Sequence, residues 1–102
     1  MVNNVLIMLL LAIPAIALAE DDGNELLDFM QRPAAHGVAL AYIDNVRTEW
    51  DGTLFCIPGD DRQAQAFDAV KLYLEANPEQ RFRPRRYLII QGLRAAYPCT
   101  PK

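Results

Sequence analysis

Apolar residues recur at helical spacing along most of the chain, and no stretch alternates strictly enough to predict a strand. The pattern therefore predicts an all-α protein. Asp22, with Glu25 three residues later, forms a capping-box start for a short first helix, and Arg32-Pro33 ends it. The apolar face of this helix consists of Leu26, Leu27 and Met30.

A second helix is predicted to run to about Trp50, after a turn at residues 34–37. Its apolar positions are Val38, Ala39, Tyr42, Ile43, Val46 and Trp50. Asp51-Gly52 breaks the pattern, and an apolar loop over residues 53–58 follows. Pro58-Gly59 suits the central positions of a type II turn.

Two more helices complete the pattern. Asp60, with Gln63 at the third helical position, starts a third helix that Asn77-Pro78 stops. Pro84 suits the first turn of a fourth helix, which is apolar nearly all round, so we expect it to lie centrally. Gly92 lies inside this helix, where glycine lowers helix stability by about 1 kcal/mol relative to alanine. We expect another helix to pack closely against this position and compensate for that cost. The sequence predicts one small all-α bundle of four to five helices.

The first 19 residues have the pattern of a signal peptide. Residues 5–12 are an unbroken apolar run, Pro14 breaks it, and Ala17-Leu18-Ala19 precedes Glu20. The run is too short to span a bilayer. We therefore expect cleavage after Ala19, export to the periplasm without membrane attachment, and a mature domain of residues 20–102.

The chain holds two cysteines, Cys56 and Cys99. In an oxidising compartment, two cysteines in a small domain usually form a disulfide. The mature domain is near the size at which one hydrophobic core is barely sufficient, so a covalent crosslink would add needed stability. We predict a Cys56–Cys99 disulfide.

Charge is unevenly distributed along a chain whose net charge is −3. Residues 20–61 hold ten acids and two bases, a net of −8, whereas residues 62–102 hold three acids and eight bases, a net of +5. Either the two halves lie against each other and neutralise, or they leave a dipolar surface that steers a charged partner.

Candidate catalytic and metal-binding groups are scarce. His36 is the single histidine, in the predicted turn, and no local signature supplies a nucleophile for it. The two cysteines and the histidine lack the close spacing of metal ligands. We therefore predict a non-enzymatic protein without cofactor or metal.

Four arginines, Arg81, Arg83, Arg85 and Arg86, surround Pro84 at the start of the fourth helix. Cations at a helix N-terminus oppose the helix dipole, so another interaction must favour them. They either pair with acids such as Glu79 and those of the first two helices, or form a site for an acidic protein partner. Nucleic acid is disfavoured because the exported domain is acidic overall.

Several motifs, taken in order, resemble the Rap/Tai family of type VI secretion immunity proteins over about residues 24–100. They are Tyr42-Ile43-Asp44-Asn45-Val46, Cys56-Ile57-Pro58, Val70-x-x-Tyr73-Leu74-x-x-Asn77-Pro78, Leu88-Ile89 to Leu93, and Ala96-Tyr97-Pro98-Cys99. The family pattern differs in having a second cysteine pair, near positions where this chain has Met30 and Ala39, and glycines where it has Ala41 and Asn45.

The resemblance implies a periplasmic, helical, disulfide-bonded protein that binds and blocks a type VI effector, typically a peptidoglycan amidase. Similar proteins are homodimers that cover the effector's cysteine–histidine cleft with an inter-helix loop and neighbouring surface.

Two charged connections are the predicted partner-binding segments, because binding residues concentrate on loops held by rigid scaffolds. The first comprises Gly59, Asp60, Asp61 and Arg62, and the second Glu79, Gln80, Arg81 and Arg83.

Two other functions also fit a small, exported helical protein with one disulfide. One is a periplasmic acid-stress chaperone of the Hde type, which would open in acid and expose apolar surface. The other is an orphan envelope protein that retains the immunity fold without an effector, since fold alone does not fix function.

Overall fold

The computed structural model describes residues 21–100; the predicted signal peptide of residues 1–19 and its cleavage site lie outside this part. The elements are α2 (Gly23–Gln31), η1 (Pro33–Ala35), α3 (His36–Trp50), α4 (Arg62–Ala76), η2 (Pro78–Gln80) and α5 (Arg85–Ala96), where η marks a 3-10 helix. Between residues 21 and 100 β pairing is limited to two isolated bridges, so the predicted all-α class with four main helices is confirmed. No helix there has the length and apolar character needed to cross a membrane.

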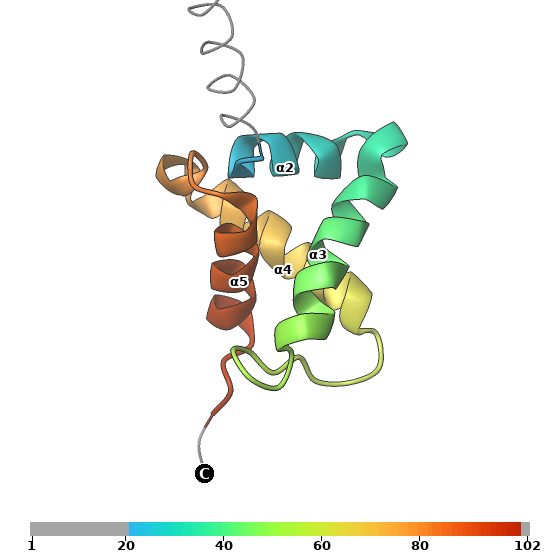
Figure 1. Cartoon of the computed structure of the whole chain (residues 1–102), viewed down its shortest axis with the longest axis vertical. Helices are drawn as coiled ribbons and strands as arrows, with labels where there is room; N and C mark the ends of the chain where they lie inside the picture. Colours follow the sequence, from blue (N-terminus) through green and yellow to red (C-terminus); the bar gives the residue numbers. More distant parts are fainter. Residues whose placement is uncertain (1–20, 101–102) are drawn as a thin grey trace, which may run out of the picture.

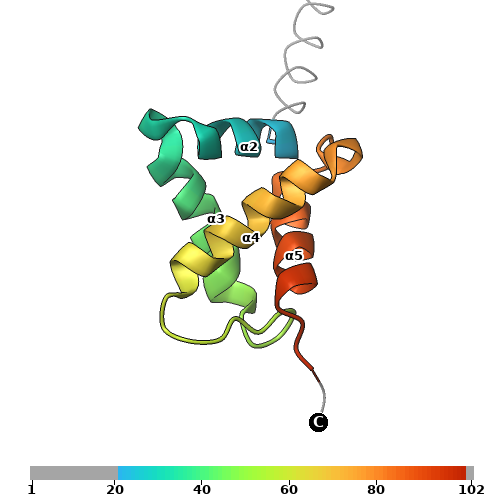
Figure 2. The ribbon, with the colours of Figure 1, turned by 180° about the vertical axis from the view of Figure 1, so that it is seen from behind.

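The four α-helices enclose one hydrophobic core. α2 lies across one end of α3 and α5, and α4 runs diagonally between them (Figure 1). Seen from behind, α4 crosses in front of α3 and ends beside α5 (Figure 2). α4 packs against all three other helices, and the loop from α3 to α4 closes the end of the bundle opposite α2.

The start of α2 is held by its own cap and by a distant segment. The Asp22 carboxylate accepts a hydrogen bond of 3.0 Å from the Glu25 N–H, which confirms the predicted N-cap. The N–H groups of Gly23 and Asn24 stand at the start of the helix, where no carbonyl of α2 can accept from them. They donate instead to the carbonyls of Arg83 and Arg81, each at 3.1 Å. The beginning of α2 thereby fixes the backbone of the connection between α4 and α5.

Two predicted boundaries need correction. The turn expected at residues 34–37 is instead η1 followed directly by α3, because the fixed φ of Pro33 returns the chain to helical conformation at once. α4 begins at Arg62 with Asp61 at the N-cap position and no side-chain cap, so the predicted Asp60 start is wrong. The Asp61 backbone, with ψ of 54°, lacks the extended conformation typical of a capping residue.

Pro84, expected in the first turn of the fourth helix, stands instead at the N-cap position before Arg85. Three other predicted helix ends agree with the structure. α2 ends at Arg32-Pro33, α3 ends at Trp50, and α4 ends at Ala76 before Asn77-Pro78. Gly59 has φ of +81°, as the second central position of a type II turn requires.

The core is contributed by every α-helix and by the loop after α3. Its buried hydrophobic side chains are Leu26, Leu27, Met30, Ala39, Ile43, Val46, Phe55, Ile57, Ala66, Phe67, Val70, Leu74, Leu88, Ile89 and Leu93. A Cβ atom on Gly92 would lie 3.1 Å from Tyr73 Cβ, so the predicted close packing at this glycine is confirmed.

α5 is buried on one side only. Leu88, Ile89 and Leu93 face the core, but Tyr87 is 40% exposed and Arg94 is exposed. We expected this fourth helix to be buried all round at the centre of the bundle, and the exposed face of α5 shows that this is wrong. The central position between the other helices is taken by α4.

Candidate partner-binding surfaces

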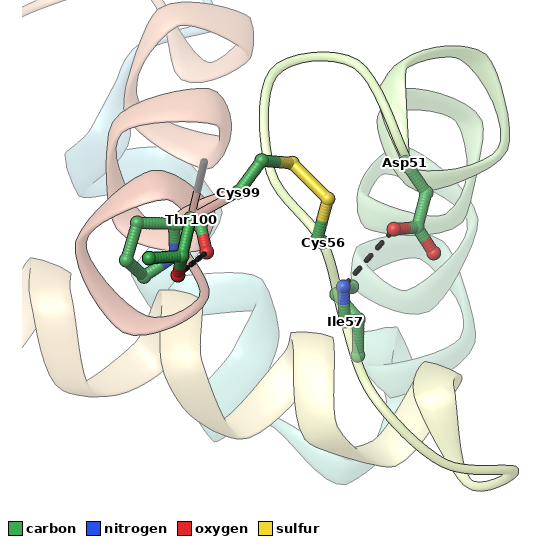
Figure 3. The surroundings of a disulfide bond; sticks show 6 residues. Asp51, Cys56, Ile57, Cys99 and Thr100 are labelled. Carbon is green, nitrogen blue, oxygen red and sulfur yellow. Dashed lines mark hydrogen bonds between the residues drawn. A yellow bond between two sulfur atoms is a disulfide. The ribbon is translucent and has the colours of Figure 1, made fainter. Parts of the chain in front are cut away.

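The predicted disulfide is present and joins the loop after α3 to the segment after α5. The sulfur atoms of Cys56 and Cys99 are 2.03 Å apart and the Cα atoms 4.9 Å apart. The Cys56 N–H donates to the Tyr97 carbonyl at 2.8 Å. The Ile57 N–H donates to Asp51 Oδ1 at 3.1 Å, next to the disulfide (Figure 3). The loop is thus held by a covalent bond and by hydrogen bonds on both sides of it.

The first predicted binding segment, residues 59–62, projects from this loop. Gly59, Asp60, Asp61 and Arg62 are all exposed. The preceding Phe55 and Ile57 are 0% and 4% exposed and anchor the loop in the core. The structure therefore presents two carboxylates and a guanidinium between this anchored loop and the start of α4.

The second predicted segment, Glu79–Arg83, is held differently along its length. Glu79 and Arg83 are exposed, whereas Gln80 and Arg81 are half-buried. An Arg81 guanidinium nitrogen donates to the Leu74 carbonyl at 3.1 Å, near the end of α4. Arg81 therefore satisfies a helix carbonyl, which leaves it less available to a partner than Arg83.

The two predicted segments do not form one site. They lie before and after the 15-residue helix α4. A helix of that length spans about 22 Å. Figure 2 shows the two connections at opposite ends of α4. The structure thus presents two separate candidate surfaces.

Within residues 21–100, some guanidinium groups of the arginine cluster are paired with carboxylates of the protein, and others are not. Arg85 pairs with Asp21 at 2.6 Å and lies 3.6 Å from the centre of the Tyr42 ring. Arg86 pairs with Glu49 of α3. The expectation that the acidic and basic halves neutralise each other is confirmed for these two arginines.

Arg83 lies in an exposed aromatic group that the sequence analysis missed. Its guanidinium carbon is 5.6 Å from the centre of the Phe82 ring and 5.3 Å from that of Tyr87. Phe82 is 70% exposed. The available signal was the alternation Arg81-Phe82-Arg83 in a short connection, where a phenylalanine between two arginines has little chance of reaching the core.

A groove of about 330 Å³ lies between the starts of α3 and α4. The His36 ring lies 4.6 Å from the Phe67 ring, and Asp61 and Asp68 line the same groove. Its lining contains carboxylates but no serine, threonine or cysteine. The groove can therefore pair with a cation, but it holds no hydroxyl or thiol nucleophile for His36 to activate.

Metal binding has no support in the described part of the chain. Between residues 21 and 100, no group of three or more histidine, cysteine, aspartate or glutamate side chains is placed to hold a metal ion.

The structure is thus a small, disulfide-bonded helical scaffold with charged connections at both ends of α4, a form suited to binding through surface contacts. The sequence model of the Rap1a immunity proteins matches residues 22–99, and the chain belongs to this family. The match supports a type VI immunity protein that binds a protein effector, and immunity proteins generally act without catalysis. No curated protein and no solved structure matches the chain.

Proposed function

We propose that the protein binds a type VI secretion effector, a peptidoglycan amidase, in the periplasm and blocks its active site. The family match over residues 22–99 carries this proposal. The signal peptide expected at residues 1–19 would deliver the protein to the compartment in which such an amidase acts.

Inhibition by occlusion requires only that a rigid surface covers the effector's cleft. Both candidate segments are suited to this, because the disulfide and its neighbouring hydrogen bonds anchor the loop directly before residues 59–62, and α2 holds the backbone of Arg81 and Arg83. A stable inhibitory complex buries at least about 1,200 Å² in total. Either end of the molecule needs neighbouring helix surface to reach that area.

The test uses the purified protein and the exported amidase encoded beside it. A stoichiometric complex and loss of peptidoglycan hydrolysis support the proposal. Charge reversal at Asp60 and Asp61, compared with charge reversal at Arg83, then shows which end carries the interface. An amidase that neither binds the protein nor loses activity in its presence overturns the proposal. Suppressed aggregation of unrelated proteins in strong acid but not at neutral pH would then favour the chaperone function.

Location and oligomeric state are parts of the same proposal. We expect the protein in the periplasmic fraction of cells, without its first 19 residues, as mass spectrometry would show. We also expect a homodimer, as light scattering of the purified protein would show. Recovery of the full-length chain in the cytosol would contradict export.

A further inference from the structure

One exposed face of α5 carries a continuous row of polar and aromatic side chains. It consists of Tyr87, Gln91 and Arg94 of the helix together with Arg83 of the connection just before it, and we name these four residues the α5 stripe. Gln91 is half-buried and the other three are exposed. The Arg83 guanidinium lies over the Tyr87 ring, and Gln91 Nε2 donates to the Tyr87 hydroxyl at 3.3 Å. Contacts within the row thus hold three of its four side chains in place before any partner binds.

The stripe leads into a hollow in the surface. Gln91 and Arg94 line a depression of about 620 Å³, whose opposite side comes from the loop after α3. The other lining residues are Thr53, Leu54, Tyr73, Ala95, Pro98 and Cys99. The disulfide fixes the loop side of this hollow relative to α5.

The hydrogen-bonding groups of the stripe and its hollow favour an anion. Arg83 and Arg94 supply guanidinium donors, and the hydroxyl groups of Thr53 and Tyr73 can donate as well. No carboxylate lines the hollow. Among residues 21–100, neither Arg83 nor Arg94 forms an ion pair, whereas Arg85 and Arg86 are paired with Asp21 and Glu49. The fold therefore neutralises one pair of arginines and leaves the other available.

We propose that the α5 stripe binds an acidic segment of the effector, with carboxylates on Arg83 and Arg94 and an apolar side chain against Tyr87. This inference rests on the proposed function and specifies the chemistry of the partner. Guanidinium groups pair with carboxylates in two parallel hydrogen bonds, which gives the contact direction as well as attraction. A long polyanion such as nucleic acid fits less well, because the whole chain carries a net charge of −3.

The first measurement is the affinity of the effector for single variants of the stripe. Arg83→Glu, Arg94→Glu and Tyr87→Ala are each expected to weaken binding by about 30-fold or more, as anchor residues do. Arg83 and Arg94 are exposed, so the melting temperature should stay unchanged in their two variants. Lys71→Glu makes the same change of charge on α4, where this residue forms no ion pair within the described part, and is expected to change affinity less than about threefold.

The outcomes separate the stripe from the proposed function. If the unaltered protein inhibits the amidase and all three stripe variants bind as tightly as Lys71→Glu, the stripe proposal is overturned and the proposed function stands. If the unaltered protein does not bind the amidase, the proposed function fails, and the stripe is judged with a synthetic peptide of alternating glutamate and leucine. Amide NMR shifts at the stripe that Arg83→Glu and Arg94→Glu abolish support it, and unchanged shifts overturn it.

Discussion

Arginine residues that are neighbours in this sequence have very different surroundings. Arg81 is half-buried and donates to a carbonyl of α4, Arg83 lies over two aromatic rings, and Arg85 and Arg86 pair with acids. Composition and spacing show a basic cluster, but only the three-dimensional structure separates arginines that support the fold from those that can meet a partner.

Arg81→Ala is expected to lower the free energy of unfolding by about 2 kcal/mol, because it removes a charge-assisted hydrogen bond to the Leu74 carbonyl. Arg83→Ala is the matched control and should change stability by less than about 0.5 kcal/mol, since its side chain is exposed. Urea unfolding of both variants measures the difference. Equal stability of the two variants would contradict a structural role for Arg81.

Glycine substitutions give a second comparison at single positions. Gly92→Ala places a Cβ atom 3.1 Å from Tyr73 Cβ and 3.4 Å from Val70 Cα, both fixed to the backbone of α4. We expect destabilisation by about 1 kcal/mol or more, because overpacking outweighs the gain in helix propensity. Gly37→Ala meets no atom within 4 Å and should stabilise α3 by about 0.5 kcal/mol. Thermal melts that show Gly92→Ala to be the more stable variant would refute this packing argument.

At the scale of helices, a capping residue read from the sequence caps its helix only where its own backbone has the extended conformation that capping requires. Asp22 caps α2 as its spacing to Glu25 predicts, because its own backbone is extended, with φ of −100° and ψ of −176°. Asp61 stands at the corresponding position of α4 but makes no side-chain cap. The same residue type therefore contributes differently to two helices.

Asp22→Ala should lower the free energy of unfolding by about 1 kcal/mol, through loss of the 3.0 Å bond to the Glu25 N–H. Asp61→Ala should cost no more than a few tenths of a kcal/mol, the contribution of an exposed charge near the helix dipole. Chemical denaturation of the two variants under identical conditions measures this. A larger loss for Asp61→Ala would show that this side chain caps α4 after all.

Helix ends marked by proline or by asparagine–proline were predictable from sequence, because proline restricts the backbone before it. η1 was not predicted, since Pro33 suits both a 3-10 turn and an irregular one, and the residues after it do not decide between them. The face that α5 exposes was also hidden, because its row of apolar residues suggested burial on all sides while α4 occupies the centre.

For the molecule as a whole, the disulfide was predictable from composition and expected compartment, and the structure confirms it. The two segments predicted to bind a partner lie in connections on either side of α4, with residues 59–62, Glu79 and Arg83 exposed, but their positions at opposite ends of this helix could not be read from the chain. The contact of Arg83 with Phe82 and Tyr87 was equally inaccessible, because it depends on how the connection folds back towards α5.

Reduction of the disulfide is expected to lower the free energy of unfolding by about 4 kcal/mol, because the bond constrains a loop of over 40 residues in the unfolded chain. Melting curves with and without reductant measure this. A Cys56→Ser, Cys99→Ser double variant should melt at the reduced protein's temperature and ignore reductant. An unchanged melting temperature on reduction would show that the hydrophobic core alone suffices.

Both α4 and α5 lie between Cys56 and Cys99 in the sequence. A ribosome makes Cys56 first, so this thiol remains unpaired while the 42 residues between the two cysteines are synthesised. A chain that stops before Cys99 can never close the bridge, so any such fragment that retains α4 and α5 lacks the crosslink that ties the loop after α3 to the end of the bundle.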